Sequence, residues 1–168
     1  MKKNLSFREI DELVVKLSKY LKSGDVISLE GDLGTGKTTI VQKISKELGI
    51  KENIKSPTFN YVLEYNSGKF PLYHFDVYRI SDPMEIYEIG YEDYIYGEGV
   101  TVIEWGNIIE TELPKEYIKI LLEYAGEESR DIEIRVEGNR ERERELLKNV
   151  GFSNWYVDKS WFCCTFWR

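Results

Sequence analysis

The glycine-rich stretch at residues 31–38 constrains the fold more than any other part of the chain. Its sequence, GDLGTGKT, matches the pattern G-x-x-x-x-G-K-[ST]. Glycines let the backbone curl so that successive N–H groups point at phosphate oxygens, and a helix that starts there adds the positive end of its dipole. Residues 26–29 predict a strand before the loop, and residues 37–48 predict a helix after it.

This context predicts a binding site for the phosphates of a nucleoside triphosphate. Lys37 supplies a positive charge for the β- and γ-phosphates, and Thr38 offers a hydroxyl to Mg²⁺. No motif that reads the base stands out, so the pattern does not distinguish ATP from GTP. The residues assigned to this loop are Gly31, Asp32, Leu33, Gly34, Thr35, Gly36, Lys37 and Thr38.

Hydrophobic periodicity divides the rest of the chain into further elements. A helix is predicted near residues 6–21, because apolar residues recur at helical spacing behind a capping-box pattern of Ser6 and Glu9. Strands are predicted at residues 61–65, 72–75, 100–103, 117–124 and 132–136, and helices at 83–89 and 139–149. With no internal repeat, this order predicts a single α/β domain whose central sheet is mixed but mostly parallel and is flanked by helices.

Two carboxylates follow predicted strands and are candidates for metal binding or for catalysis beside the phosphates. Asp76 ends the run at residues 72–75, and Glu104 ends the apolar run at residues 99–103. The carboxyl ends of parallel strands line one crevice, so both side chains are expected near the phosphate loop. One of them would bind the metal ion with Thr38 and the other would lie near the attacking water, although each residue type is also found simply capping a strand.

Two further residues near these strand ends are singled out by their type. Trp105 directly follows Glu104, which is unusual for a solvent-exposed loop, so it is predicted to pack near the site. His74 is the only histidine of the chain, and strand alternation places it on the face opposite Phe75. A single histidine is more often structural than catalytic, and His74 is interpreted in that way.

The charge distribution limits the classes of partner. Residues 56–138 hold 18 acidic and 6 basic residues, and the whole chain has a net charge of −7 and a pI near 5.0. This balance argues against strong autonomous binding of nucleic acid, and the acidic segment is either a solvated face or a surface for a basic partner. No apolar run approaches a membrane span and no secretory signal is visible. The adjacent Cys163 and Cys164 fit a reducing compartment, so a cytoplasmic location is expected.

Several blocks in order give the chain a family resemblance. They are Gly24-Asp25-Val26-Ile27, the glycine loop, Ser56-Pro57-Thr58-Phe59, Tyr73-His74-Phe75-Asp76-Val77-Tyr78-Arg79, Asp82-Pro83 to Gly90 with Glu92-Asp93-Tyr94, and Val102-Ile103-Glu104-Trp105. Together they resemble the TsaE (YjeE) family of P-loop ATPases, which serve threonylcarbamoyladenosine modification of bacterial tRNA. The resemblance implies a P-loop NTPase fold, with residues 1–138 as the ATPase domain. Residues 139–168 depart from the family pattern and are predicted to be a charged helix and an aromatic tail, packed on the domain or appended to it.

The resemblance also implies roles for particular residues. Residues from Gly31 to Thr39 would hold the ATP phosphates, with Trp105 at the border of the nucleotide site. Thr38 and Glu104 would bind Mg²⁺, while Lys37, Thr58 and Asp76 would act in catalysis. Thr58 would sense the γ-phosphate in a switch-like segment, Asp76 would orient or activate the hydrolytic water, and Ser6 would lie near the base.

The same resemblance implies an auxiliary function. Mg-dependent hydrolysis of ATP to ADP and phosphate would act on a TsaB–TsaD complex that modifies the adenosine next to the tRNA anticodon. The chain alone would be a weak ATPase that its partners stimulate.

Other functions remain open beside this one. A P-loop kinase for a nucleoside or other small molecule usually carries a lid with several arginines, whereas residues 56–129 hold only Arg79. Arg140, Arg142 and Arg144 are the candidates for such a lid. A nucleotide-binding adaptor without turnover is a third possibility. The aromatic tail at residues 151–168, the last part of the divergent segment, would act as a lid, in self-association or in partner contact.

Overall fold

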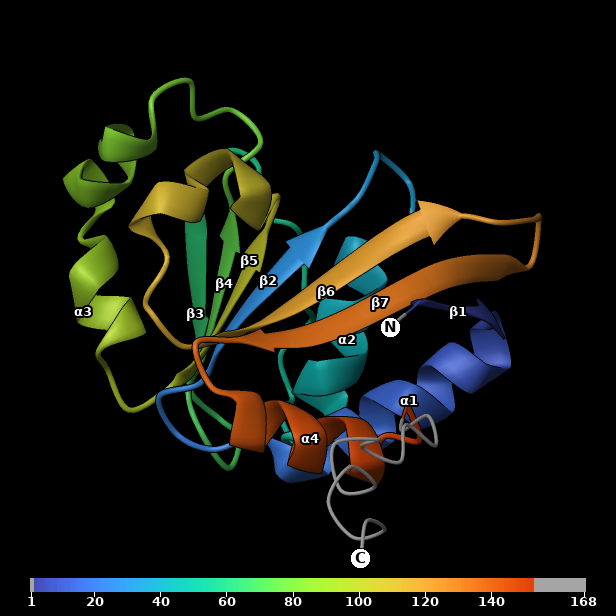
Figure 1. The fold of residues 1–168 in the computed structure, drawn as a ribbon. Coiled ribbons are helices and arrows are strands. Elements are labelled where there is room, and N and C mark those ends of the chain that lie inside the picture. Colours follow the sequence, from blue (N-terminus) through green and yellow to red (C-terminus); the bar gives the residue numbers. More distant parts are fainter. Residues whose placement is uncertain (1, 153–168) are drawn as a thin grey trace, which may run out of the picture.

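A computed structural model describes residues 2–152, so the predicted aromatic tail beyond Phe152 and both cysteines lie outside the described residues. Within residues 2–152 a single seven-stranded sheet has the order β1-β7-β6-β2-β5-β4-β3 (Figure 1). Strands β6, β2, β5 and β4 run parallel, and antiparallel pairs extend the sheet on both sides. The strands are β1 Lys2–Ser6, β2 Val26–Glu30, β3 Val62–Tyr65, β4 Leu72–Asp76, β5 Val100–Glu104, β6 Tyr117–Tyr124 and β7 Ser129–Glu137.

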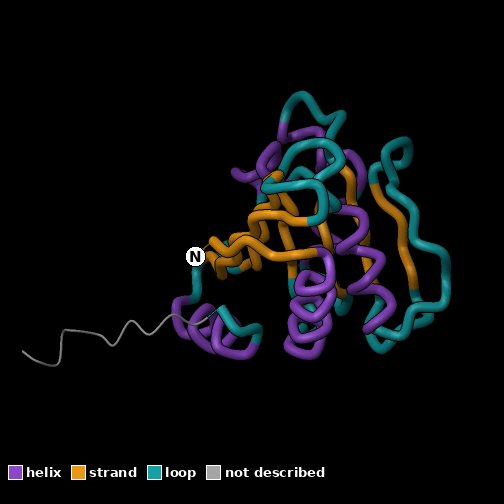
Figure 2. Tube along the Cα trace, turned by 90° about the vertical axis from the view of Figure 1, so that its right-hand side faces the viewer, coloured by secondary structure: helices purple, strands orange, loops and turns teal. Residues whose placement is uncertain are grey.

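Helices cover both faces of the sheet (Figures 1 and 2). They are α1 Phe7–Tyr20, α2 Lys37–Glu47, α3 Tyr91–Ile95, α4 Arg140–Asn149 and the 3₁₀ helices η1 Pro83–Ile89 and η2 Gly106–Glu112. One hydrophobic cluster joins the sheet to α1, α2 and α4, and a second cluster joins the opposite face to η1, α3 and η2. The predicted α/β class, with one domain and a mostly parallel sheet, is confirmed. No helix that the structure describes is long and apolar enough to span a bilayer.

Side-chain alternation along the central strands decides which residues meet the phosphate loop. In β4, Leu72 joins the α2-side cluster and Phe75 joins the opposite one. His74 and Asp76 therefore share the face of Leu72, as the alternation at residues 72–76 predicted. In β5, Val102 lies on the α2 side, so Glu104 also points toward the helix that follows the loop.

Local signals explain most of the element boundaries. Ser6 and Glu9 form the predicted capping box at the start of α1, and Asp82 with Glu85 caps η1 behind Pro83. Three elements were missed: β1, α3 and η2. Strand β1 reads KKNLS, which is too polar to predict a strand, and it forms because its backbone pairs with the edge of β7. The other two span only five and seven residues, too few for a periodic pattern.

The charged helix α4 packs on the domain through one face, while Arg140, Glu141, Arg144 and Glu145 of its other face are exposed. Leu146 is fully buried in the same cluster as α1. Arg142 forms hydrogen bonds of 2.6 Å with both carboxylate oxygens of Asp25 and one of 3.0 Å with Glu116. Since Asp25 immediately precedes β2, this contact lies at the opposite end of the strand from the phosphate loop.

Candidate functional site

The loop at residues 31–36 joins β2 to α2 at the carboxyl end of the parallel strands (Figure 1). The backbone passes close to β6, where a Cβ on Gly31 would overlap the carbonyl oxygen of Leu122. Gly31 also has a φ of 134°, which L side chains rarely adopt, so this position requires glycine. The carbonyl oxygen of Asp32 accepts hydrogen bonds from the amide and the hydroxyl of Thr35, at 3.3 and 2.9 Å, and these close the turn.

Lys37 is the first residue of α2 and is only 5% exposed. Its ammonium group donates to the carbonyl oxygens of Gly31 (2.6 Å) and Asp32 (2.9 Å), and lies 3.7 Å from the centroid of the Trp105 ring. Burial lowers the pKa of Lys37. Neighbouring carboxylates act in the opposite direction, in decreasing order those of Glu104, Asp76 and Asp32. The backbone dipoles and the aromatic face therefore hold this charge beside the acidic residues.

A chain of buried polar contacts leads from the loop into the sheet. The hydroxyl of Thr38 lies 3.0 Å from Oε2 of Glu104, and Nε2 of His74 lies 2.8 Å from Oε1 of the same carboxylate. His74 is fully buried and Glu104 is 3% exposed. A threonine hydroxyl beside an oriented carboxylate is a set of oxygen ligands that suits Mg²⁺. These residues therefore fit the ion that the sequence pattern implies.

Asp76 lies beside Glu104 in the parallel register of β4 and β5. Its Oδ2 accepts hydrogen bonds from the hydroxyls of Ser56 (2.6 Å) and Thr58 (2.9 Å), and these two hydroxyls are 2.8 Å apart. Its Oδ1 accepts from the amide of Tyr78 at 3.2 Å. The carboxylate is therefore oriented by the segment at residues 56–58, for which the family resemblance implies a switch-like role.

These groups share one cavity of about 440 Å³. It is lined by Leu33, Gly34, Gly36, Lys37, Thr38, Thr39, Ser56, Thr58, Asp76, Tyr78, Glu104 and Trp105. Trp105 leaves β5 with a φ of 64°, which turns its ring toward Tyr78 at a centroid distance of 5.0 Å. All residues predicted for metal binding or catalysis line this cavity, whereas Gly31, Asp32 and Thr35 of the loop do not.

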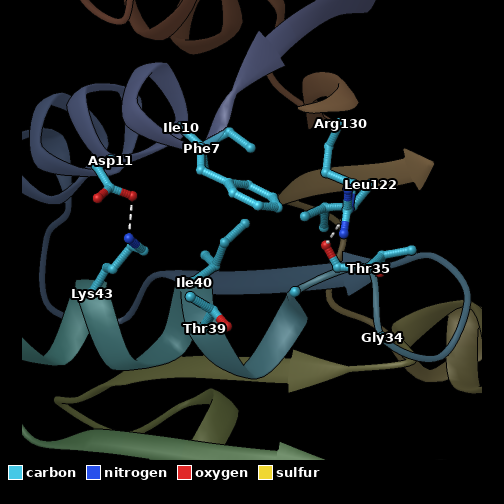
Figure 3. Close-up of a pocket in the computed structure, with 11 residues that line it drawn as sticks. Phe7, Ile10, Asp11, Gly34, Thr35, Thr39, Ile40, Lys43, Leu122 and Arg130 are labelled. Carbon is cyan, nitrogen blue, oxygen red and sulfur yellow. Dashed lines mark hydrogen bonds and ion pairs between the residues drawn. The ribbon is translucent and has the colours of Figure 1, made fainter. Parts of the chain in front are cut away.

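A second cavity, of about 350 Å³, lies on the other side of the loop (Figure 3). Gly34, Gly36 and Thr39 line both cavities, so the two adjoin along the loop. The wall is largely apolar, with Phe7, Ile10, Ile40 and Leu122. Its polar side chains are Thr35, Thr39, Arg130 and the ion pair of Asp11 with Lys43. Ser6, which the resemblance puts near the base, caps α1 and is followed directly by Phe7, which lines this cavity.

Sequence reasoning missed several residues that the fold brings to the site. Ser56 carried a usable signal, because its hydroxyl stands two residues before Thr58 in the same block. His74 was interpreted as structural, yet its ring contacts Glu104. Tyr78, Phe7 and Arg130 gave no signal, because the sequence does not state which turns and helix ends approach the loop.

Comparisons with known proteins give matches over most of the chain. The family model described as "Threonylcarbamoyl adenosine biosynthesis protein TsaE" matches residues 5–132. The chain is 42% identical over 143 residues to the tRNA threonylcarbamoyladenosine biosynthesis protein TsaE of Bacillus subtilis, covering 82% of this chain and 89% of that protein. It is 45% identical over 126 residues to the protein of the same name from a Nostoc species, covering 73% and 76%. The crystal structure of Bacillus subtilis YdiB superposes with a TM-score of 0.72 at 35% identity, covering 90% of this chain and 93% of that one.

Proposed function

Because the chain belongs to the TsaE family of threonylcarbamoyl adenosine biosynthesis proteins, we propose that it binds Mg-ATP at the phosphate loop and hydrolyses it to ADP and phosphate in support of that tRNA modification. The observation that carries this proposal is the contact of Thr38 with Glu104, 3.0 Å apart, in one cavity with Lys37 and Asp76. A phosphate-binding charge, an oxygen ligand pair and a second, oriented carboxylate are the parts that phosphoryl transfer to water needs.

Each of these groups has a separate task in the proposed reaction. Lys37 would bind the β- and γ-phosphates, and Thr38 and Glu104 would hold Mg²⁺. When bound, the ion would neutralise charge that develops on the phosphate oxygens. Asp76 would accept a hydrogen bond from the attacking water and orient it. Its Oδ2 already accepts from Ser56 and Thr58, so these hydroxyls would fix the direction of the carboxylate toward the water.

The second cavity supports a place for the nucleoside part of ATP. Its apolar wall suits a flat base, and it adjoins the phosphate cavity through Gly34 and Gly36. A nucleotide that spans the loop would put its base against Phe7 and its γ-phosphate near Asp76. Both cavities would then be occupied by one ligand.

Two of the arginines within residues 2–152, Arg142 and Arg79, do not favour the kinase alternative. Arg142 is engaged by Asp25 at the far end of β2, so it is not available to a lid over the phosphates. The guanidinium of Arg79 lies 4.6 Å from the Phe59 ring centroid. Hydrolysis therefore fits the described residues better than transfer to a bound acceptor, which would need several arginines at the phosphates.

A TsaB–TsaD pair is the proposed partner, and the mouth of the first cavity supports a docking role. Leu33 lines this cavity and is 77% exposed, and Phe59, which directly follows the lining residue Thr58, is 81% exposed. Large apolar side chains at an exposed site are typical of a surface that another protein covers. The acidic balance of the chain supports a function in which the partner complex, and not this protein, holds the tRNA.

Phosphate release from Mg-ATP, measured with the chain alone and with TsaB–TsaD, tests the proposal. We expect weak release alone and faster release with both partners. Lys37→Ala should abolish it, and Lys46→Ala, a change of an exposed lysine on the same helix, should not. Glu104→Ala should weaken Mg²⁺-dependent turnover more than nucleotide binding. Phosphate passed to a nucleoside would establish the kinase instead, and binding without turnover under any condition would establish an adaptor.

A further inference from the structure

The hairpin formed by β6 and β7 contacts the phosphate loop at two backbone carbonyl groups, and none of the functions above uses these contacts. The hydroxyl of Tyr124 donates to the carbonyl oxygen of Leu33 at 2.8 Å. Nε of Arg130 donates to the carbonyl oxygen of Thr35 at 3.1 Å (Figure 3). The two donors therefore hold alternate peptide groups of the same loop.

Arg130 is itself firmly held, so it provides a fixed point for the loop. It is only 7% exposed, and its Nη1 donates to the carbonyl oxygens of Gly126 (3.1 Å) and Ser129 (2.7 Å) in the turn of the hairpin. Its guanidinium also lies 5.0 Å from the Phe7 ring centroid and 4.7 Å from that of Tyr124. Such stacking on aromatic faces adds to the hydrogen bonds in restricting the side chain.

The consequence for the loop follows from the geometry of the peptide group. In a planar trans peptide, the C=O of one residue and the N–H of the next point in opposite directions. A hydrogen bond to the Leu33 carbonyl therefore directs the N–H of Gly34 away from the hairpin, and a bond to the Thr35 carbonyl does the same for Gly36. Gly34 leaves room for this contact, since a Cβ there would lie 2.7 Å from the Tyr124 hydroxyl.

We propose that Tyr124 and Arg130 are positioning residues, which hold the Leu33 and Thr35 carbonyls so that the N–H groups of Gly34 and Gly36 are set to bind phosphate before the nucleotide arrives. This inference rests on the proposed binding of ATP at the loop. Preorganised backbone donors bind an anion without the cost of ordering the loop, so the hairpin contributes to affinity although it touches the phosphates through no side chain of its own.

Tyr124→Phe tests the proposal, because it removes the hydroxyl and keeps the ring against Arg130. The matched control is Tyr96→Phe, which removes a hydroxyl from a tyrosine that is 74% exposed and remote from both cavities. Affinity for a fluorescent ATP analogue with Mg²⁺ is measured directly, and affinity for tripolyphosphate is measured by competition. We expect both dissociation constants to rise roughly fivefold in Tyr124→Phe, as for the loss of one hydrogen bond, and we expect its Tm to be unchanged. Tyr96→Phe should have the same dissociation constants as the unchanged protein.

Tripolyphosphate carries no base, so a loss of affinity for it reports weaker binding of phosphate and not damage to the second cavity. Equal affinities of Tyr124→Phe and the unchanged protein for both ligands would overturn the proposal. So would a loss for the ATP analogue alone, or tripolyphosphate that fails to compete in the unchanged protein. Arg130→Lys provides a second variant, which keeps the charge but cannot reach three carbonyls from one planar group, and it should also weaken the binding of both ligands.

Failure of the proposed function can be told from failure of the positioning role. If the unchanged protein binds the ATP analogue no better than Lys37→Ala does, the proposed function itself is wrong. If the unchanged protein binds the analogue and the hairpin variants bind it equally well, the function stands and the positioning role is wrong.

Discussion

The contact of His74 with Glu104 leads to a prediction about the affinity for Mg²⁺. It distinguishes a histidine that only stabilises the fold from one that orients a metal ligand. His74 is fully buried, its Nε2 lies 2.8 Å from Oε1 of Glu104, and its Nδ1 has no hydrogen-bond partner. The imidazole therefore makes one polar contact, which orients the carboxylate proposed to hold Mg²⁺. His74→Leu replaces the ring with an apolar side chain of similar size, whereas His74→Gln keeps a donor near the position of Nε2.

Two magnitudes follow from this geometry. The hydrogen bond to a charged acceptor is worth about 1.5–3 kcal/mol, and removing the unpartnered Nδ1 offsets part of that loss. A net loss of about 1–2 kcal/mol would lower Tm by roughly 3–8 °C for a domain of this size. The effect on Mg²⁺ should be larger, since losing a residue that orients a metal ligand typically costs roughly 10–100-fold in metal affinity.

The assay is a Mg²⁺ titration of ATP hydrolysis, together with nucleotide affinity measured in the presence of a chelator. In His74→Leu, we expect the half-saturating Mg²⁺ concentration to rise about tenfold or more while the metal-free affinity for ATP is unchanged. His74→Gln should recover most of the Mg²⁺ response. An unchanged half-saturating concentration in His74→Leu at a lowered Tm would refute the reasoning and leave His74 a purely structural residue.

Two further predictions concern the docking of α4. Arg142→Ala would leave the buried carboxylate of Asp25 without its charged partner and with only the amide of Lys22, 2.8 Å away, as a donor. Breaking such a pair costs roughly 3–5 kcal/mol and should lower Tm by about 10 °C in thermal denaturation. The exposed Arg144→Ala serves as its control, and equal Tm values for the two variants would contradict the reasoning. Hydrogen bonds from Asn139 and Arg142 lower the pKa of Glu116 from its ordinary value of 4.5. Because the lowered pKa belongs to the folded state, the ionised Glu116 contributes its full stability above pH 4.5. That contribution is lost as the pH falls through the lowered pKa. Glu116→Gln should therefore lower the unfolding free energy at pH 7 by less than about 1 kcal/mol and should match the unchanged protein in acid. A difference in unfolding free energy that persists at a pH below the lowered pKa would contradict this account.

The features that sequence predicts here are those that neighbours along the chain determine. The strand, loop and helix around residues 26–48 follow from apolar periodicity and glycine placement. The proximity of Asp76 and Glu104 follows from one topological rule, because both residues end parallel strands. Each of these inferences needs only local pattern and a known way of assembling strands.

The features that sequence did not predict depend on contacts between distant segments. Arg142 meets Asp25 across 117 positions, although its place in a run of alternating charges does not distinguish it from its exposed neighbours. Arg130 meets Thr35 across 95 positions, in a strand whose alternation of polar and apolar residues is ordinary. Nothing near either residue signals the partner, and only the tertiary packing selects it.

The phosphate loop is braced from two directions, and the two sides should affect different steps. On one side, β5 presents Glu104 to Thr38. On the other, the hairpin presents Tyr124 and Arg130 to backbone carbonyls of the loop. Changes on the hairpin side alter the direction of N–H groups and so should act on the affinity for phosphate, while changes behind Glu104 should act on the response to Mg²⁺. If variants on both sides shifted the same quantity, the loop would behave as one cooperative unit, and assigning separate tasks to its two supports would be wrong.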